Sequence, residues 1–485
     1  MRSLTLVGDW VDFEQCEGNN GSAVWKKLAF SVCFFHAMVQ ERTRFGSLGW
    51  NIPYEFNDSD LEAGLLLLKM FLVEQPNVPY DALQYMTAVN GYGGRVTDFL
   101  DERCIETVLT KFYNPAVLKE DYCFDSKGVY KIPSGEGNLQ AFVDYTKTLP
   151  LTDPPDVFGM HENASITVQF NETRSILGVA LSVQPRDAGG GGGKTSDEVV
   201  SELATEFASR MPPVLMEEEA GPTTFVIRGE YMDSLGTALK QELTRYNNII
   251  VKMASTLIDI QRAIRGEVLM SAELDEQYTA MLNNQVPANW ASVAYPSLKP
   301  LASWMQDLIA RLTFMRTWLV NGPPNVFWFG GFYFPQGFLT GAQQNHSRKY
   351  RQAIDSLDYS FTILETADVA EIDPDMGSTI DGVLCTGMYF DGARWDYDNK
   401  YVCDPRPAEN FTLLPVTHFL PVPGHKPNVN DYACPCYKTS TRSGALSTTG
   451  MSTNYVLNVE LPCGASKRPS QWVLAGVALL TNLDD

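Results

Sequence analysis

Apolar residues recur at helical spacing through the first third of the chain. Residues 23–42 carry apolar side chains around most of the helix circumference, which is typical of a helix buried on several sides. A second helix is predicted to begin with a capping box, in which Ser59 and Glu62 each accept a hydrogen bond from the other's backbone N–H. Leucines then follow at spacings of three or four: Leu61, Leu65, Leu68 and Leu72. A third helix is predicted from residue 98 to 112.

The pattern weakens between these helices and the next helical block. Residues 113–155 mix prolines, glycines and aromatic residues without a clear period, which predicts an irregular segment with short strands. Residues 173–183 read as a strand because aliphatic residues dominate a short run. The five consecutive glycines at 189–193 predict a flexible linker.

Helical spacing returns over residues 196–345. Thr195 and Glu198 are spaced as a capping box at the start of this block. The strongest helical pattern covers residues 234–265, where apolar side chains recur every three or four positions. A further helix is predicted over 297–320, because Gly322 and two prolines follow it.

After about residue 350 the pattern changes to short extended runs separated by Gly, Pro, Asp and Asn. Six runs are predicted to be strands: 380–390, 393–403, 411–420, 430–438, 453–461 and 471–480. Short strands with regular turn signals favour a small antiparallel barrel or sandwich. The fold class predicted for the whole sequence is therefore α+β, with helices first and a sheet structure last.

Charge and composition disfavour several classes of protein. The net charge of −21 disfavours binding to nucleic acid, because an acidic surface repels the phosphate backbone. The nine cysteines are irregularly spaced and the N-terminus lacks an apolar leader, so we expect reduced thiols in a cytosolic compartment. Apolar runs are much shorter than the roughly 20 residues of a membrane span, and no membrane association is expected.

One segment resembles a nucleotide-binding loop. Residues 188–195 read AGGGGGKT, close to the G-x-x-x-x-G-K-[ST] pattern whose amides and lysine hold phosphates. Ala188 replaces the first glycine, and four glycines at the variable positions suit a linker better than a preformed phosphate cradle. We therefore interpret the segment as a linker and helix cap, and reject Lys194 and Thr195 as nucleotide-binding residues. A stand-alone nucleotide-binding protein remains the alternative.

Other candidate chemistry is weak. Cys434 and Cys436 flank a single proline, whereas zinc sites favour CxxC spacing and need two further ligands, so no metal site is expected. No Ser or Cys nucleophile motif is present, and no catalytic residue is assigned. The aromatic stretch 327–334 is interpreted as core, with Gly330 and Gly331 allowing a close backbone approach.

Several long strings resemble dynein heavy chains. FFHAMVQERTRFGSLGWNIPYEFNDSDL and GYGGRVTDFLD are similar to the lid of the sixth AAA+ module, and VFGMHENASIT is similar to the passage that follows it. Five further strings resemble the C-terminal domain of that family: VPANW, YPSLKPL, GPPNVFWFGGFYFPQGFLTGAQQN, GMYFDGARWD and YKTSTRSGALSTTGMSTNYVLNVELP. The strings occur in family order, and their aromatic content resembles axonemal rather than cytoplasmic dyneins.

The resemblance implies a domain organisation. Residues 1–157 are expected to form the helical AAA6 lid and residues 158–485 the dynein C-terminal domain. Within the second part, 158–195 would hold a strand and linker, 196–350 the helical layer, and 351–485 a small β-barrel.

The resemblance also implies a function. The protein is expected to be a non-catalytic segment that closes and couples the ring of an ATP-driven, minus-end-directed microtubule motor in the axoneme of a cilium or flagellum. ATP and Mg²⁺ would act in other modules of the full motor. The expected partners are the rest of the motor ring and, through the full complex, intermediate chains, light chains and microtubules. An axonemal adaptor is a second alternative. Five residues within the strings are interface candidates: Trp50, Tyr92, Arg95, Arg394 and Trp395.

Overall fold

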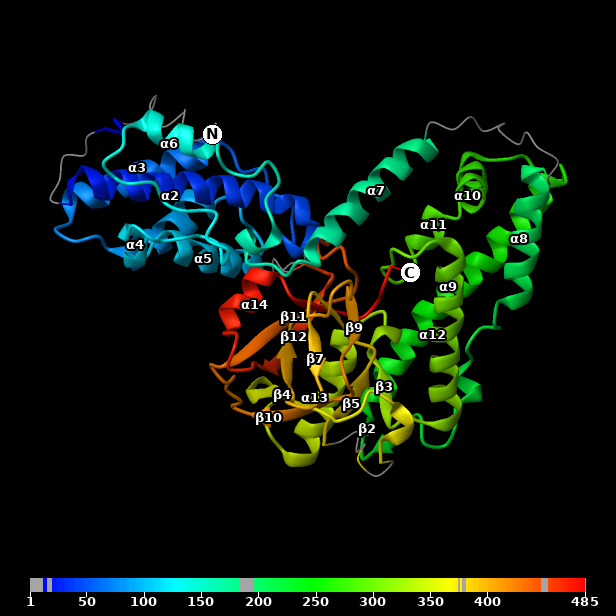
Figure 1. The fold of residues 1–485 in the computed structure, drawn as a ribbon. Helices are drawn as coiled ribbons and strands as arrows, with labels where there is room; N and C mark the ends of the chain where they lie inside the picture. The colour runs from blue at the N-terminus through cyan, green and yellow to red at the C-terminus, as the bar shows by residue number, and fades with distance from the viewer. Residues whose placement is uncertain are drawn as a thin grey trace.

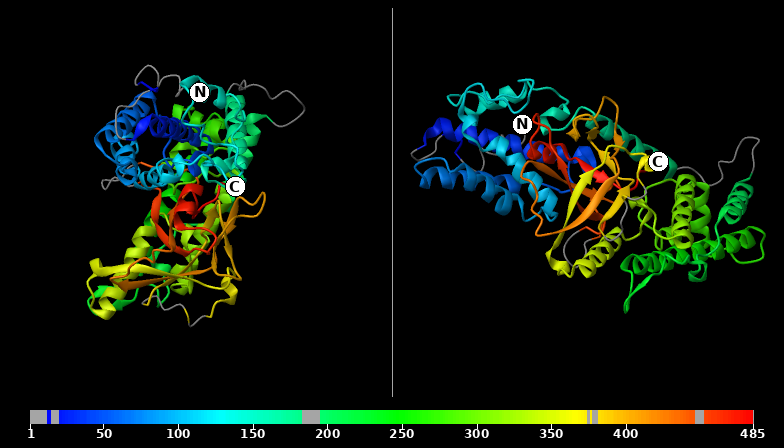
Figure 2. Two further views of the ribbon diagram at one scale, coloured as in Figure 1. Left: turned by 60° about the vertical axis from the view of Figure 1, so that its left-hand side comes forward. Right: turned by 90° about the horizontal axis from the view of Figure 1, so that it is seen from below.

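The computed structural model describes residues 12–14, 20–182, 195–373, 376, 381–445 and 452–484. The described residues form both helices and sheets, which confirms the α+β class. Figures 1 and 2 show two helical groups on opposite sides of the strands, with α7 running between them. Within the described ranges, no helix combines the length and apolar content needed to cross a membrane.

The first helical group is a compact bundle. Its elements are α2 (Gly21–Glu41), η1 (Arg42–Leu48), α3 (Asp58–Glu74), α4 (Tyr80–Met86), η2 (Thr87–Tyr92), α5 (Phe99–Phe112), η3 (Pro115–Leu118) and α6 (Leu139–Thr146). The three predicted helices are confirmed, and the four leucines of α3 are buried. Helix α2 contacts both α3 and α5, so it forms the centre of the bundle.

The predicted capping box of α3 was placed two residues too late. Asn57 is the N-cap: its side chain accepts from the Ser59 amide, and the Asp60 carboxylate accepts from the Asn57 N–H at 2.8 Å. Asn57 and Asp60 are three positions apart, as are Ser59 and Glu62, so either pair has the spacing of a capping box. The helix begins earlier because both Asn57 and Asp60 make their hydrogen bonds from that position.

The prediction of a strand at 173–183 was wrong. Residues 173–182 continue α7 (Ala164–Ser182), which starts after the turn η4 (Pro155–Phe158), and residue 183 lies outside the described residues. A short apolar run cannot be told from a helical segment by periodicity alone, and the helix started at Ala164 simply extends through it. The segment 113–155 is largely irregular as predicted, but it contains the helical elements η3 and α6, and its described strand-like pairing is a bridge between Cys123 and Lys131.

The second helical group confirms the predicted block. Its helices are α8 (Ser196–Arg210), α9 (Ser234–Ile264), α10 (Ala272–Leu282), α11 (Ala288–Ala291), α12 (Leu301–Asn321) and α13 (Pro335–Tyr350). Thr195 caps α8 in the predicted box with Glu198. Helix α12 ends at Gly322, whose φ of 90° suits glycine. A short hairpin, β1 (Ile227–Arg228) with β2 (Tyr231–Met232), precedes α9.

The strands form two main sheets. The elements are β3 (Val326–Trp328), β4 (Leu357–Ile363), β5 (Val383–Thr386), β6 (Tyr389–Asp391), β7 (Arg394–Asp396), β8 (Tyr401–Cys403), β9 (Phe411–Leu413), β10 (Thr417–Pro423), β11 (Asp431–Tyr437), β12 (Tyr455–Pro462) and β13 (Ala478–Leu480). The sheet orders are β3-β5-β10-β4 and β12-β11-β13-β6-β9, with β7 and β8 as a hairpin. No closed ring of paired strands occurs among the described residues, so the barrel stays a prediction.

Two details of the strand region bear on the predictions. The run 471–480 is not one strand: α14 (Pro469–Ala475) precedes β13, because Pro469 at the first helical position and Gly476 at φ 68° delimit a helix. Helix α14 lies against α5 of the bundle. The close approach predicted at Gly330 is confirmed, since a Cβ there would stand 2.3 Å from the Thr481 carbonyl oxygen.

Two large apolar cores result. One fills the bundle and includes Trp25, Leu65 and Phe112. The other spans the second helical group and both sheets, and includes Trp304, Trp318 and Phe419. Leu474 of α14 belongs to the bundle core although it lies far along the sequence, so the two halves meet there.

Candidate functional site

The bundle and the strand region are joined by buried polar contacts, here called the seam and carried by Arg42, Asn51, Arg103 and Asn163. Arg42 is fully buried and directly follows α2. Its guanidinium donates to the Gly49 carbonyl at 3.1 Å, the Phe158 carbonyl at 2.8 Å and the Leu474 carbonyl at 3.0 Å. Because these carbonyls come from three separate segments, one side chain fixes their relative positions.

Asn51 makes the second contact of the seam. Its side-chain amide donates to the Asp98 carboxylate at 3.0 Å and to the Tyr437 hydroxyl oxygen of β11 at 2.9 Å. Its backbone N–H donates to Asp101 at 3.0 Å, and Tyr54 donates its hydroxyl to the same carboxylate at 2.9 Å. Burial, together with the nearby charge of Asp98, raises the pKa of Asp101 to about 7.

Arg103 and Asn163 complete the seam. Arg103 donates to the Ala433 carbonyl of β11 at 3.1 Å and lies over the Tyr432 ring at 5.8 Å. Asn163 donates to the carbonyls of Arg406 and Glu409 at 2.7 and 2.9 Å. Sequence reasoning missed all four seam residues, because their partners lie up to 432 positions away. The available signal was a charged residue directly after the apolar run of α2.

A cavity of 570 Å³ lies beside the seam. The loop from Thr43 to Pro53 forms one wall, α7 a second, and the strand region a third. Asp484, near the C-terminal end, accepts from the Ser440 hydroxyl at 2.8 Å and pairs with Arg174 of α7 at 3.4 Å. Its lining combines hydroxyl, amide, aromatic and charged side chains, which suits recognition rather than acid–base catalysis.

Three interface candidates are buried within this structure. Trp50 packs in the bundle core, lines the cavity and donates its indole N–H to the Val39 carbonyl at 3.0 Å. Tyr92 is fully buried, with its hydroxyl 2.9 Å from Nδ1 of the buried His36. Trp395 of β7 lies in the second core. The side chains of the three candidates therefore stabilise the two halves.

The two candidate arginines are more accessible. Arg95 is 39% exposed and forms an ion pair with Asp60 at 2.8 Å. Because Asp60 also caps α3, this pair links the cap of α3 to the turn after η2. Arg394 is partly buried on β7, next to Trp395. The structure does not bring these five candidates together at one place.

The glycine-rich segment is only partly described. Lys194 and the five glycines lie outside the described residues. Thr195 is described, and its hydroxyl accepts from the Glu198 amide at 3.3 Å as a helix cap. The hydroxyl that a phosphate-binding loop would use to hold Mg²⁺ thus serves here as a helix cap.

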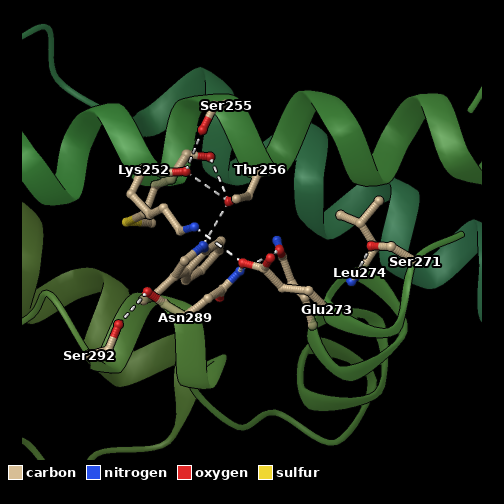
Figure 3. Close-up of polar contacts among 11 residues, drawn as sticks. Lys252, Ser255, Thr256, Ser271, Glu273, Leu274, Asn289 and Ser292 are labelled. Atoms are coloured by element: carbon tan, nitrogen blue, oxygen red, sulfur yellow. Dashed lines mark hydrogen bonds and ion pairs between the residues drawn. The ribbon is translucent and has the colours of Figure 1, made fainter.

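A second polar cluster joins α9, α10 and α11 (Figure 3). Lys252 and Asn289 both donate to the Glu273 carboxylate, at 3.1 and 3.3 Å, and Trp290 donates to the Thr256 hydroxyl at 2.8 Å. The Glu273 side chain is 60% exposed, and its pKa is lowered by the hydrogen bond from Lys252. A solvated carboxylate with a lowered pKa is a poor general base, so the cluster serves to hold the three helices together.

The paired cysteines are core residues. Cys434 and Cys436 lie on β11 and are fully buried. Burial raises the pKa of both thiols well above the ordinary value, which disfavours the thiolate that a metal or a nucleophilic reaction requires. Among the described residues, no three His, Cys, Asp or Glu side chains are grouped as metal ligands.

Comparisons with known proteins identify both halves. Residues 25–164 match the family of the dynein heavy chain AAA lid domain, and residues 170–481 match the family of the C-terminal domain of dynein heavy chains. The bundle therefore corresponds to the lid, and the second helical group with the sheets corresponds to the C-terminal domain.

Similar individual proteins are axonemal heavy chains. The sequence is 46% identical over 479 residues to dynein axonemal heavy chain 6 of Homo sapiens, covering 95% of this sequence and 11% of that protein. It is 43% identical over 480 residues to human dynein axonemal heavy chain 3, covering 99% of this sequence and 11% of that protein. It is 44% identical over 464 residues to dynein axonemal heavy chain 1 of Rattus norvegicus, covering 95% of this sequence and 10% of that protein. The protein thus spans only 10% to 11% of the length of these relatives.

Proposed function

The chain belongs to the dynein heavy chain family, and from this premise we propose that it is the ring-closing and coupling segment of an axonemal motor. In this role it hydrolyses no nucleotide itself. It transmits movement between the lid of the sixth AAA+ module and the C-terminal domain. The motor around it would use ATP and Mg²⁺ to move along microtubules towards the minus end, in a ciliary or flagellar axoneme.

The observation that carries this proposal is the seam. A coupling segment must move as one body, so that a displacement of the lid displaces the C-terminal domain. Arg42, Asn51 and Arg103 supply buried hydrogen bonds between the two parts. Each buried hydrogen bond costs about 1–3 kcal/mol to leave unmade, which opposes hinge motion between the parts.

An exposed apolar face on α3 supports a contact with the rest of the ring. Leu66, Met70 and Val73 are 49%, 42% and 42% exposed, and they follow one another at four and three residues along one helix face. An apolar stripe of this kind is commonly covered by another protein surface. We propose that a neighbouring part of the motor ring covers it, and that Arg95 and Arg394 remain accessible for interfaces.

The domain organisation proposed for this role has two parts, and Phe158, Met160 and Ala164 at the start of the second part pack in the core of the first. Residues 1–157 would form the lid and 158–485 the C-terminal domain, with 196–350 as its helical layer and 351–485 as its strand region. Intermediate chains, light chains and microtubules would be reached only through the complete complex. Nucleic acid and membranes would not be partners.

A motility assay tests the proposal. In a full-length heavy chain, Arg103→Met and Asn51→Leu together should lower the microtubule gliding velocity several-fold, because the lid and the C-terminal domain lose the Arg103–Ala433 and Asn51–Tyr437 hydrogen bonds and keep the one from Arg42 to Leu474. Arg210→Met is the matched control, since Arg210 is 39% exposed and pairs with Glu206 within the same helix, α8. Unchanged velocity in the double variant would refute coupling through the seam.

Calorimetric titration of the 485-residue protein with Mg-ATP separates the alternatives. The proposal expects no heat of binding. Binding that disappears in Lys194→Ala would instead establish the stand-alone nucleotide-binding protein. Stable capture of another axonemal protein without the rest of the motor would establish the adaptor.

A further inference from the structure

The cavity beside the seam is built from segments distant in sequence. Ser47 and Asn51 come from the lid, Asn171 from α7, and Asn410 and Ser443 from loops of the strand region. Its volume of 570 Å³ fits one or two side chains with a short stretch of backbone. The hydroxyl and amide groups of its walls are suited to hydrogen bonds with a peptide backbone.

Two exposed aromatic rings line the cavity. Phe170 is 57% exposed and Phe411 is 42% exposed, although both are large apolar side chains. The apolar surface continues along α7, because Phe170, Arg174 and Leu177 follow at four and three residues on one face. Leu177 is also 57% exposed. Because Arg174 also lines the cavity, this helix face extends about 4.5 Å beyond it to Leu177, which suits an elongated ligand.

The charged side chains of the lining are paired with one another or with a buried neighbour. Two carboxylates, Asp391 and Asp484, face one guanidinium, Arg174. Asp391 is neutralised by buried Arg442 at 2.8 Å. Asp484 pairs with Arg174 at 3.4 Å, and Arg174 is half exposed. The pair is long and its guanidinium is half exposed, so a cation from a ligand can compete with Arg174 for Asp484, whose side chain is 18% exposed.

We propose that this cavity binds a helical segment of the same heavy chain, from outside these 485 residues, that carries a basic and an apolar side chain one turn apart. The apolar side chain packs between Phe170 and Phe411, and the basic side chain pairs with Asp484. The remainder of the segment follows the exposed face of α7. This inference rests on the proposed function, because it places a further part of the motor against the seam.

The length of the relatives favours a segment of the same polypeptide. These 485 residues match 11% of human dynein axonemal heavy chain 6, so most of a complete heavy chain lies outside them. Binding of a segment of the same polypeptide is intramolecular, so a weak contact is sufficient. The net charge of −21 on these 485 residues favours a basic segment over an acidic one.

A peptide-binding experiment tests the inference. Fluorescent peptides of roughly 15 residues, about four helical turns, would tile the full-length heavy chain and be titrated into the 485-residue protein by anisotropy. At least one peptide with the basic–apolar pattern should bind. Phe411→Ser and Asp484→Asn should each weaken that binding about tenfold, which is about 1.4 kcal/mol. Replacing the basic residue of the peptide by Glu should abolish it.

Phe334→Ser provides the matched control. Phe334 is 43% exposed and has Arg245 over its ring at 5.6 Å, much as Arg174 lies over Phe170 at 5.0 Å, but it does not line the cavity. Its substitution should leave binding unchanged. The inference is overturned if no peptide of the heavy chain binds, if only peptides of other axonemal proteins bind, or if both cavity variants bind normally. Unchanged gliding velocity in the seam double variant, together with normal peptide binding, would refute the proposed function alone.

Discussion

The seam and the cavity both lie between the lid and the C-terminal domain, yet they are built differently. At the seam, Arg42 and Asn51 are buried and their hydrogen bonds lead to fixed backbone and side-chain partners. At the cavity, Phe170 and Phe411 are exposed and Asp484 relies on a long pairing with Arg174. The difference indicates that the seam maintains one arrangement of the two parts, whereas the cavity has unused capacity for a ligand.

The largest effect is expected from removing the Arg42 guanidinium. Arg42→Met keeps an apolar stem of similar length but leaves the Phe158 and Leu474 carbonyls buried without their donor. We expect the free energy of unfolding to fall by about 3 kcal/mol. Urea denaturation of the variant and the wild type measures this change. Arg210→Met, on the exposed surface of α8, should change stability by less than about 0.5 kcal/mol, and an equal loss in both variants would contradict the special role of the seam.

Asn51→Leu is expected to lower the free energy of unfolding by somewhat less, about 2 kcal/mol. The substitution leaves the Tyr437 hydroxyl and one oxygen of Asp98 without the amide donor, while Asp98 keeps its bonds from the Leu100 and Asp101 amides. Asn399→Leu is a suitable control, since Asn399 lies in an exposed turn. Thermal unfolding of both variants provides the comparison. Equal shifts of Tm would contradict a special contribution of the Asn51 hydrogen bonds to stability.

The pH dependence of stability provides a further test of the buried polar groups at the seam. The pKa of Asp101 is raised to about 7 in the folded protein, from an unfolded value near 3.8. Between these values the folded state holds a proton that the unfolded state has lost, so this group makes stability fall as pH rises. The slope reaches at most about 1.4 kcal/mol per pH unit. Asp101→Asn should flatten the profile between about pH 4 and pH 7 relative to wild type, as measured by urea denaturation at each pH. Exposed Asp121→Asn should leave the slope unchanged.

The smallest effect is expected at the cavity. Asp484→Asn removes a weak ion pair and retains an acceptor for the Ser440 hydroxyl. Stability should change by less than about 1 kcal/mol, and the difference should shrink further in high salt. Denaturation at low and high ionic strength measures both. A loss as large as that of Arg42→Met would show that the cavity is as tightly built as the seam.

Much of the helical architecture was predictable from local pattern. The spacing of Leu239, Tyr246 and Leu257 places one face of α9 in the core, and these residues are buried. The Thr195–Glu198 capping box marks the start of α8. Both signals act over three or four residues, so neighbouring side chains contain the information needed to read them.

The incorrect predictions concern segments whose local sequence is compatible with more than one structure. The residues at 173–183 could have formed either a strand or a helix, and continuation from Ala164 decided for α7. Asn57 and Ser59 could both have capped α3, and the paired hydrogen bonds between Asn57 and Asp60 decided the start. The interface candidates Trp50 and Tyr92 came from strings resembling the family, which carry no information about burial.

The sequence by itself determined most of the helical segments, though not α7 or α14, together with the α+β class and, through its long ordered strings, membership of the dynein heavy chain family. Only the tertiary structure decided that Arg42 donates to Leu474, that Asn51 reaches Tyr437, and that α7 and Asp484 enclose a cavity with the lid. Helix periodicity depends on neighbours along the chain. A hydrogen bond across 432 residues depends on how two separately packed cores dock, which no local pattern encodes.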